Sequence, residues 1–187
     1  MKLIKLATVV VVFAASTTVG HASTPAQTFD FNYSGNIGFH NDVVEVPFTI
    51  PVAASVRVWT DSFLNGANFD PIVGIWNMST GKLVAQNDDN PTVGPDQTFF
   101  DSGLTFDTLG AGPYMMTITR FSNFANGDSL SSGFQFDHEM PIPLTEGGYW
   151  EAHVAGVVPE PESYAMLLAG LGLLGFVARR GKQKQAV

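Results

Sequence analysis

The chain has 187 residues, contains no cysteine and carries a formal net charge of −8, from 17 acidic and nine basic residues. The length suits one domain with flanking targeting segments. The lack of cysteine excludes disulfide bonds, thiolate zinc sites and a cysteine nucleophile. The acidic balance argues against nucleic-acid binding, because few cations are available to neutralise phosphates.

The first 22 residues have the layout of a secretory signal peptide. Two lysines precede an apolar stretch of about ten residues, and small residues follow. Gly20 and Ala22 occupy the −3 and −1 positions of a cleavage site, so we expect signal peptidase to cut between Ala22 and Ser23. Residues 1–22 are predicted to direct export; a buried N-terminal helix is the alternative.

Residues 23–157 show the pattern of an all-β domain. Short runs of β-branched and aromatic residues alternate with turn clusters, and no amphipathic helical period is sustained. We expect an antiparallel β-sandwich of the jelly-roll type, with a closed barrel as the alternative. The expected strands are 28–33, 43–50, 54–60, 72–77, 82–86, 98–106, 113–121, 133–137 and 148–154.

An acidic loop is the best candidate for binding chemistry in this domain. Residues 23–157 contain 15 acidic groups against three basic ones, a formal charge of −12, which attracts divalent cations. Asn87, Asp88 and Asp89 follow a predicted hairpin that begins next to Asp70, and Asp61 lies on a nearby loop. Oxygen ligands of this kind suit calcium, so a calcium site is predicted. The alternative is that these residues only form turns.

Tryptophans offer a second candidate site. Trp59 and Trp150 are the two expected to be exposed and to form a platform for sugar rings, whereas Trp76 is expected in the core. The alternative places all three in the core. The histidines lack metal-ligand spacing, and no G-x-S-x-G motif occurs. The domain is therefore predicted not to be an enzyme, with a surface hydrolase as the less favoured hypothesis.

The C-terminal region contains a second apolar run, at residues 164–178, followed at once by Arg179 and Arg180. Fifteen helical residues span about 22 Å, less than the ~30 Å hydrocarbon core, so a single transmembrane helix here would be short. The basic tail favours a cytoplasmic C-terminus. A soluble helix is the alternative.

Pro159, Glu160 and Pro161 precede this run and hold the backbone extended. Together with the glycine-rich apolar segment and Arg179-Arg180, residues 158–187 resemble the PEP-CTERM sorting signal of Gram-negative bacteria. The resemblance implies an exosortase-type processing enzyme, cleavage near the Pro-Glu-Pro, and passage from the inner membrane to the cell surface or extracellular matrix. The membrane anchor would be transient or permanent, according to whether the tail is cut.

Segments of the middle region are similar to bacterial pre-peptidase C-terminal-like domains. They are Val46–Pro51 with Ala54–Val58, Phe69–Trp76 with Gly81–Asp89, and Leu109–Tyr114. This resemblance implies a non-catalytic accessory module of the kind sometimes linked to calcium or matrix polymers. The resulting hypothesis is an exported structural or adhesive protein of the surface or matrix, without a required cofactor. The alternative is a calcium-dependent or carbohydrate-binding module that recognises exopolysaccharide.

Overall fold

The computed structural model describes residues 10–11, 28–158 and 171. It is all-β, with two antiparallel sheets and two short 3-10 turns. The elements are β1 (Val10–Val11), β2 (Thr28–Asn36), β3 (Val43–Ile50), β4 (Ala54–Thr60), η1 (Leu64–Gly66), β5 (Pro71–Asn77), β6 (Lys82–Asn87), β7 (Gly103–Leu109), β8 (Gly112–Arg120), η2 (Leu130–Ser132) and β9 (Tyr149–Val157).

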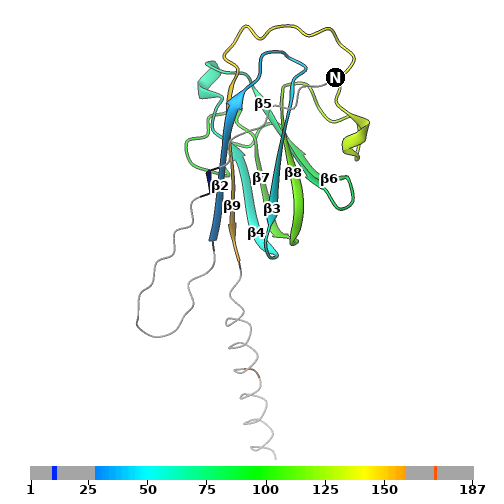
Figure 1. Ribbon diagram of the computed structural model, residues 1–187. Coiled ribbons are helices and arrows are strands. Elements are labelled where there is room, and N and C mark those ends of the chain that lie inside the picture. Colours follow the sequence, from blue (N-terminus) through cyan, green and yellow to red (C-terminus); the bar gives the residue numbers. More distant parts are fainter. Residues whose placement is uncertain (1–9, 12–27, 159–170, 172–187) are drawn as a thin grey trace, which may run out of the picture.

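The strands form nested antiparallel pairs that are rolled into two layers (Figure 1). Strand β2 pairs with β9, β3 with β8, β4 with β7, and β5 with β6. Strands β1-β2-β9-β4-β7 form one sheet, and β3-β8-β5-β6 form the other. This nesting, with successive strands alternating between two sheets, is the arrangement of a jelly roll. The predicted all-β fold with two antiparallel sheets is therefore confirmed for the described residues.

The core lies between the two sheets and is built by period-two alternation. In β4, Val56 and Val58 point inward and are fully buried, whereas Arg57 points outward. Val154 of β9 and Ile118 of β8 are fully buried in the same cluster. Each such side chain contributes about 1.5–3 kcal/mol when it is removed from water. The pattern that predicted strands in the sequence is thus the pattern that stabilises the sandwich.

Two tryptophans fix the spacing of neighbouring elements. Trp76 is fully buried, as expected, and its indole N–H donates to Oγ1 of Thr117 at 2.9 Å. Trp150 lies opposite Gly35 in the β2–β9 ladder. A Cβ atom at Gly35 would be 2.8 Å from the Trp150 ring, so only glycine fits at this position.

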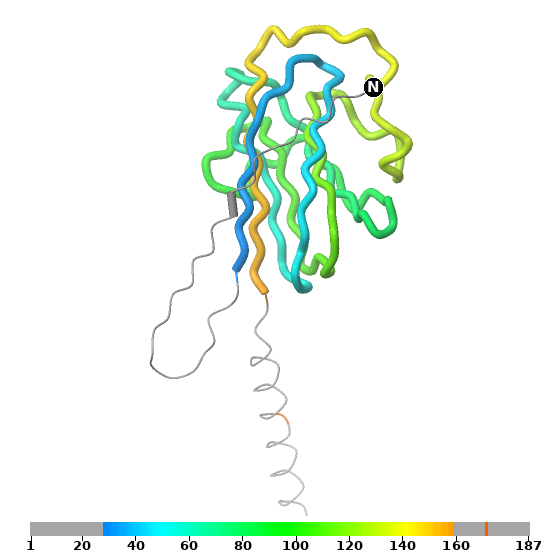
Figure 2. The backbone as a smooth tube through the Cα atoms, in the orientation of Figure 1, coloured from blue at the N-terminus to red at the C-terminus, as the bar shows by residue number. Residues whose placement is uncertain are grey.

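The first and last strands of the sandwich have their free termini at the same end of the domain. Thr28, the first residue of β2, pairs with Val157, the last residue of β9, and the tube in Figure 2 shows these strands side by side. Strand β1 belongs to the predicted signal peptide and pairs with Phe31 and Asn32 on the outer side of β2. Removal of residues 1–22 would leave β2 as the edge strand.

Two expected strands were wrong in part or in full. Strand β7 begins at Gly103, because residues 98–101 form a turn in which the Asp101 carboxylate accepts a 2.7 Å hydrogen bond from the Thr98 N–H. Residues 133–137 form a turn rather than a strand. It begins at Gly133, whose φ of 72° suits glycine, and the Phe134 N–H donates to the Asp137 carboxylate at 2.9 Å.

The targeting segments fall largely outside the described residues. These include the predicted cleavage pair, Ala22 and Ser23, and the sorting residues Pro159, Glu160, Pro161, Arg179 and Arg180. Of the predicted span at 164–178, only Leu171 is described. Within residues 10–11, 28–158 and 171, no helix has the length and apolar character that crossing a membrane requires.

Candidate functional site

The predicted acidic loop forms a cluster of three carboxylates. Asp70 immediately precedes β5, and Asp88 and Asp89 immediately follow β6. Because β5 and β6 pair antiparallel, with Val73 opposite Asn87, the start of one strand lies beside the end of the other. One carboxylate oxygen from each of the three aspartates lies within 4.8 Å of the others. The predicted juxtaposition of Asp70 and Asp88 is confirmed.

The electrostatics of this cluster are unfavourable in the absence of a cation. Burial, followed by the charges of Asp88 and Asp89, raises the pKa of Asp70 to about 7, although Arg120 opposes the shift. Burial and the charge of Asp89 raise the pKa of Asp88 to about 6. Atom Oδ1 of Asp70 and Oδ1 of Asp88 are both buried without a hydrogen-bond partner among the described residues. A bound cation would relieve both the repulsion and the missing contacts.

Backbone oxygens surround the base of the cluster. The buried Ser102 hydroxyl lies 2.7 Å from the carbonyl oxygen of Pro71, 2.9 Å from that of Asn87, and also contacts that of Asp88. A hydroxyl has only one proton to donate, so it can satisfy only one of these three carbonyl oxygens. Three carbonyl oxygens thus converge on one hydroxyl beside the cluster, and oxygens of this kind are ligands that a hard cation accepts.

The Asn87 side chain makes a contact that was not predicted from the sequence. Its side-chain Oδ1 accepts a 3.0 Å hydrogen bond from the Gly103 N–H, at the start of β7. The Asn87 side chain therefore joins β6 to β7, and one lone pair of its amide oxygen is engaged in this bond. Asp70, Asp88 and Asp89 remain the candidate metal ligands.

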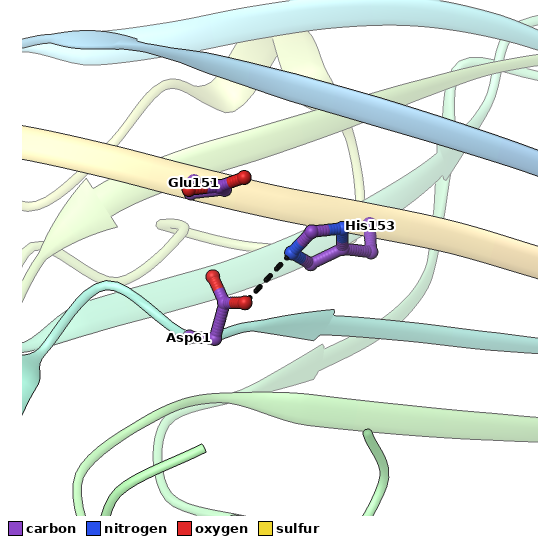
Figure 3. A group of neighbouring side chains, drawn as sticks. All are labelled: Asp61, Glu151 and His153. Atoms are coloured by element: carbon purple, nitrogen blue, oxygen red, sulfur yellow. Dashed lines mark hydrogen bonds and ion pairs between the residues drawn. The ribbon is translucent and has the colours of Figure 1, made fainter. Parts of the chain in front are cut away.

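A second cluster, formed by Asp61, Glu151 and His153, was missed in the sequence (Figure 3). Asp61 follows β4. Glu151 and His153 lie two residues apart on β9, so both side chains are on its outer face. Atom Nε2 of His153 lies 3.0 Å from Oδ2 of Asp61. Asp61 and His153 are 92 residues apart in the sequence, so their contact could not be predicted from local spacing. The sequence signal for this cluster was the i, i+2 spacing of Glu151 and His153 on a predicted strand.

The His153 ring is held on both sides. Its Nδ1 lies 2.5 Å from Oδ1 of Asn32 on β2, and the ring stacks on Trp59 with 4.8 Å between ring centroids. Burial alone lowers the pKa of His153, but the hydrogen bond and charge of Asp61, with the charge of Glu151, outweigh it and raise the pKa above its ordinary value. The cluster therefore attracts positive charge.

The predicted tryptophan platform is wrong, because neither ring is exposed. Trp59 is 5% exposed and Trp150 is 2% exposed. Trp59 points to the outer face of β4, but the β6–β7 loop covers it, and a Cβ at Gly94 would lie 2.2 Å from its ring. Trp150 points into the core and packs on Gly35. The exposure of an outward-facing aromatic side chain depends on the loops that cover the sheet. The alternation of residues along a strand does not predict where those loops lie.

Comparison with known proteins gives one match, at the C-terminal end. Residues 157–182 match the PEP-CTERM protein-sorting motif, which begins at the last residue of β9. No curated protein and no solved structure matches the chain, so the resemblance of the sandwich to pre-peptidase C-terminal-like domains stays a prediction. The chain carries a PEP-CTERM motif, which indicates exosortase-dependent sorting of an exported, membrane-associated protein.

Proposed function

We propose that this protein is a non-catalytic structural or adhesive component of the bacterial surface or extracellular matrix, delivered there after exosortase processing. The PEP-CTERM match at residues 157–182 is the observation that carries the proposal. In this account, signal peptidase removes residues 1–22, the C-terminal segment holds the chain in the inner membrane, and processing near Pro159–Pro161 transfers the sandwich to its destination.

The position of the motif relative to the sandwich supports this account. Strand β9 lies between β2 and β4 in the five-stranded sheet, and the motif starts at its last residue, Val157. A cut at the Pro-Glu-Pro would therefore leave every strand of the sandwich intact. It would release the complete domain rather than a fragment of it.

Intact mass and cell fractionation of the native protein test the sorting proposal. In cells with the exosortase, we expect a form that starts near Ser23, ends near Pro159–Pro161 and lies in the surface or matrix fraction. Replacing both prolines by alanine should keep the tail attached, whereas Lys184→Gln, outside the matched residues, should process normally. A chain that retains its tail and stays in the membrane, whether or not the exosortase is present, would refute the proposal.

Calcium binding by the Asp70–Asp88–Asp89 cluster is a second candidate function. Its support is the group of three converging carboxylates, of which Asp70 and Asp88 each have a buried oxygen without a partner among the described residues. Calcium takes six to eight oxygen ligands from carboxylates, carbonyls and water. The Ser102 hydroxyl, just before β7, contacts carbonyl groups at the same end of the β5–β6 hairpin, so a bound ion would lie beside the junction with β7. Calcium would then stiffen the domain in an extracellular setting.

Equilibrium binding of calcium to the full chain in detergent tests this second function. We expect one ion per chain, and loss of binding when Asp88→Asn and Asp89→Asn are combined. Asp107→Asn is the matched control, because Asp107 is exposed on β7 and does not belong to the cluster. Equal binding by the double variant and the control would refute a calcium site at this position.

A further inference from the structure

The cluster of Asp61, Glu151 and His153 differs from the acidic loop in its chemistry. It combines an imidazole nitrogen with two carboxylates, and one ligand atom from each residue lies within 4.8 Å of the others. It is built on β4 and β9 of the five-stranded sheet, whereas the acidic loop is built on β5 and β6 of the four-stranded sheet. Mixed nitrogen and oxygen donors suit a transition metal such as zinc better than calcium.

The orientation of His153 determines which nitrogen faces the carboxylates. The Asn32 oxygen, 2.5 Å from Nδ1, can only accept a hydrogen bond, so Nδ1 carries a proton. Atom Nε2 is then the atom presented to Asp61, at 3.0 Å. Metal-binding histidines are held in this way, with the second ring nitrogen donating to an oxygen of a neighbouring group. Stacking on Trp59 fixes the plane of the ring.

Among the described residues, neither carboxylate forms an ion pair with lysine or arginine. Among residues 28–158, lysine and arginine form ion pairs at Lys82–Asp128 and Arg120–Glu146, and neither pair involves this cluster. Atom Oδ1 of Asp61 is buried without a hydrogen-bond partner in the described part of the chain. The Glu151 carboxylate accepts a 2.7 Å hydrogen bond from the Tyr149 hydroxyl, which orients it. The cluster thus has two anionic groups and an unsatisfied buried oxygen.

We propose that Asp61, Glu151 and His153 bind a divalent transition metal of the zinc type. The ion takes Nε2 of His153 and one oxygen from each carboxylate, and water or a donor from another molecule fills the fourth position. Ligands about 2.0–2.2 Å from a tetrahedral ion lie roughly 3.3–3.6 Å apart, so the observed 3.0 Å between Nε2 and Oδ2 must widen by about half an ångström. The bound ion ties the end of β4 to β9, the strand that leads into the sorting motif.

Zinc titration of the chelator-treated full chain in detergent tests the proposal. Saturating calcium is present throughout, so that the Asp70 cluster does not take up zinc. We expect one zinc ion per chain, with the affinity reduced at least tenfold by Glu151→Gln and abolished by His153→Gln. His138→Gln is the matched control, because His138 is exposed and lies outside both clusters. Cobalt in place of zinc should give a visible absorption band that the same two variants lose.

The Glu151 variant keeps the test decisive if His153→Gln disturbs folding. Glu151 lies on the outer face of β9, and glutamine preserves an acceptor for the Tyr149 hydroxyl. Zinc binding by a folded Glu151→Gln chain with unchanged affinity would overturn the proposal. So would an undiminished cobalt band in both variants, since the metal would then be bound elsewhere.

Discussion

The two carboxylate clusters lie at the two ends of one loop but have different origins. Asp61 immediately follows β4 of one sheet, and Asp70 immediately precedes β5 of the other. The Asp70 cluster is assembled by a single hairpin and contains only oxygen ligands, whereas the Asp61 cluster joins strands that are distant in sequence and includes a histidine nitrogen. The two proposed sites would thus differ in metal preference, although one loop supplies a ligand to each.

The largest expected effect is on the response to calcium. Combining Asp70→Asn with Asp88→Asn should remove the calcium-induced rise in Tm, which for a ligand at 100 times its Kd corresponds to about 2.7 kcal/mol, or roughly 5–10 °C at this chain length. The metal-free variant should nevertheless melt above the unaltered chain at pH 7.5, because burial and charge repulsion, which raise both pKa values, no longer disfavour a charged group at these positions. Thermal melts with calcium or a chelator check both expectations. If calcium still raises the Tm of this variant, calcium does not bind at the Asp70 cluster.

The second effect concerns the base of the Asp70 cluster. Ser102→Ala should destabilise the protein by about 1–3 kcal/mol, because the hydroxyl proton that lies between three carbonyl groups is lost. Denaturant unfolding in the presence of a chelator measures this loss. Thr105→Ala, at an exposed position of the following strand, β7, is the control. An unchanged free energy of unfolding would mean that the hydroxyl does not hold the carbonyls together.

The third effect is confined to the Asp61 cluster. Asn32→Ala should lower zinc affinity about tenfold, the effect typical of losing a group that orients a metal-binding histidine. Calcium binding should not change, because Asn32 lies on β2, outside the Asp70 cluster. Parallel titrations with the two ions measure both affinities. Equal weakening of calcium and zinc binding would indicate general damage to the fold instead.

The smallest effect is the pH dependence of the metal-free protein. The pKa values of Asp70 and Asp88 rise to about 7 and about 6 on folding, so the folded state binds more protons than the unfolded state between about pH 4 and 7. Stability from these groups therefore falls as the pH rises through this window. The raised pKa of His153 acts in the same direction. Thermal melts in chelator should show Tm falling by a few degrees from pH 5.5 to 8, and a rising Tm would contradict the assignment.

Local patterning explains why the strands were predictable. The bounds of β3 and β4 follow the sequence prediction, since alternation such as that of Val56 and Val58 with Arg57 reports the buried face directly. The turns at 98–101 and 133–137 were not predictable in this way. In each turn an aspartate carboxylate captures backbone N–H groups that a strand would otherwise use.

The candidate sites also differ in whether their residues are close together or far apart in the sequence. The Asp70 cluster could be predicted, because hairpin geometry places the two flanks of β5 and β6 together. The Asp61 cluster could not, because Asp61 and His153 meet only through the pairing of β4 with β9. The burial of Trp59 could not be predicted either, because the loop around Gly94 that covers it has no repeating sequence pattern.

One measurement tests the distinction between the clusters most directly. Calcium and zinc are titrated against the same full-chain sample, alone and in the presence of the other ion. With calcium saturating, the account predicts one calcium and one zinc per chain, and zinc does not displace the bound calcium. Calcium binding is lost in the Asp88→Asn, Asp89→Asn double variant, and zinc binding is weakened in Glu151→Gln. Competition for a single site, or zinc and calcium lost together in either variant, would contradict it.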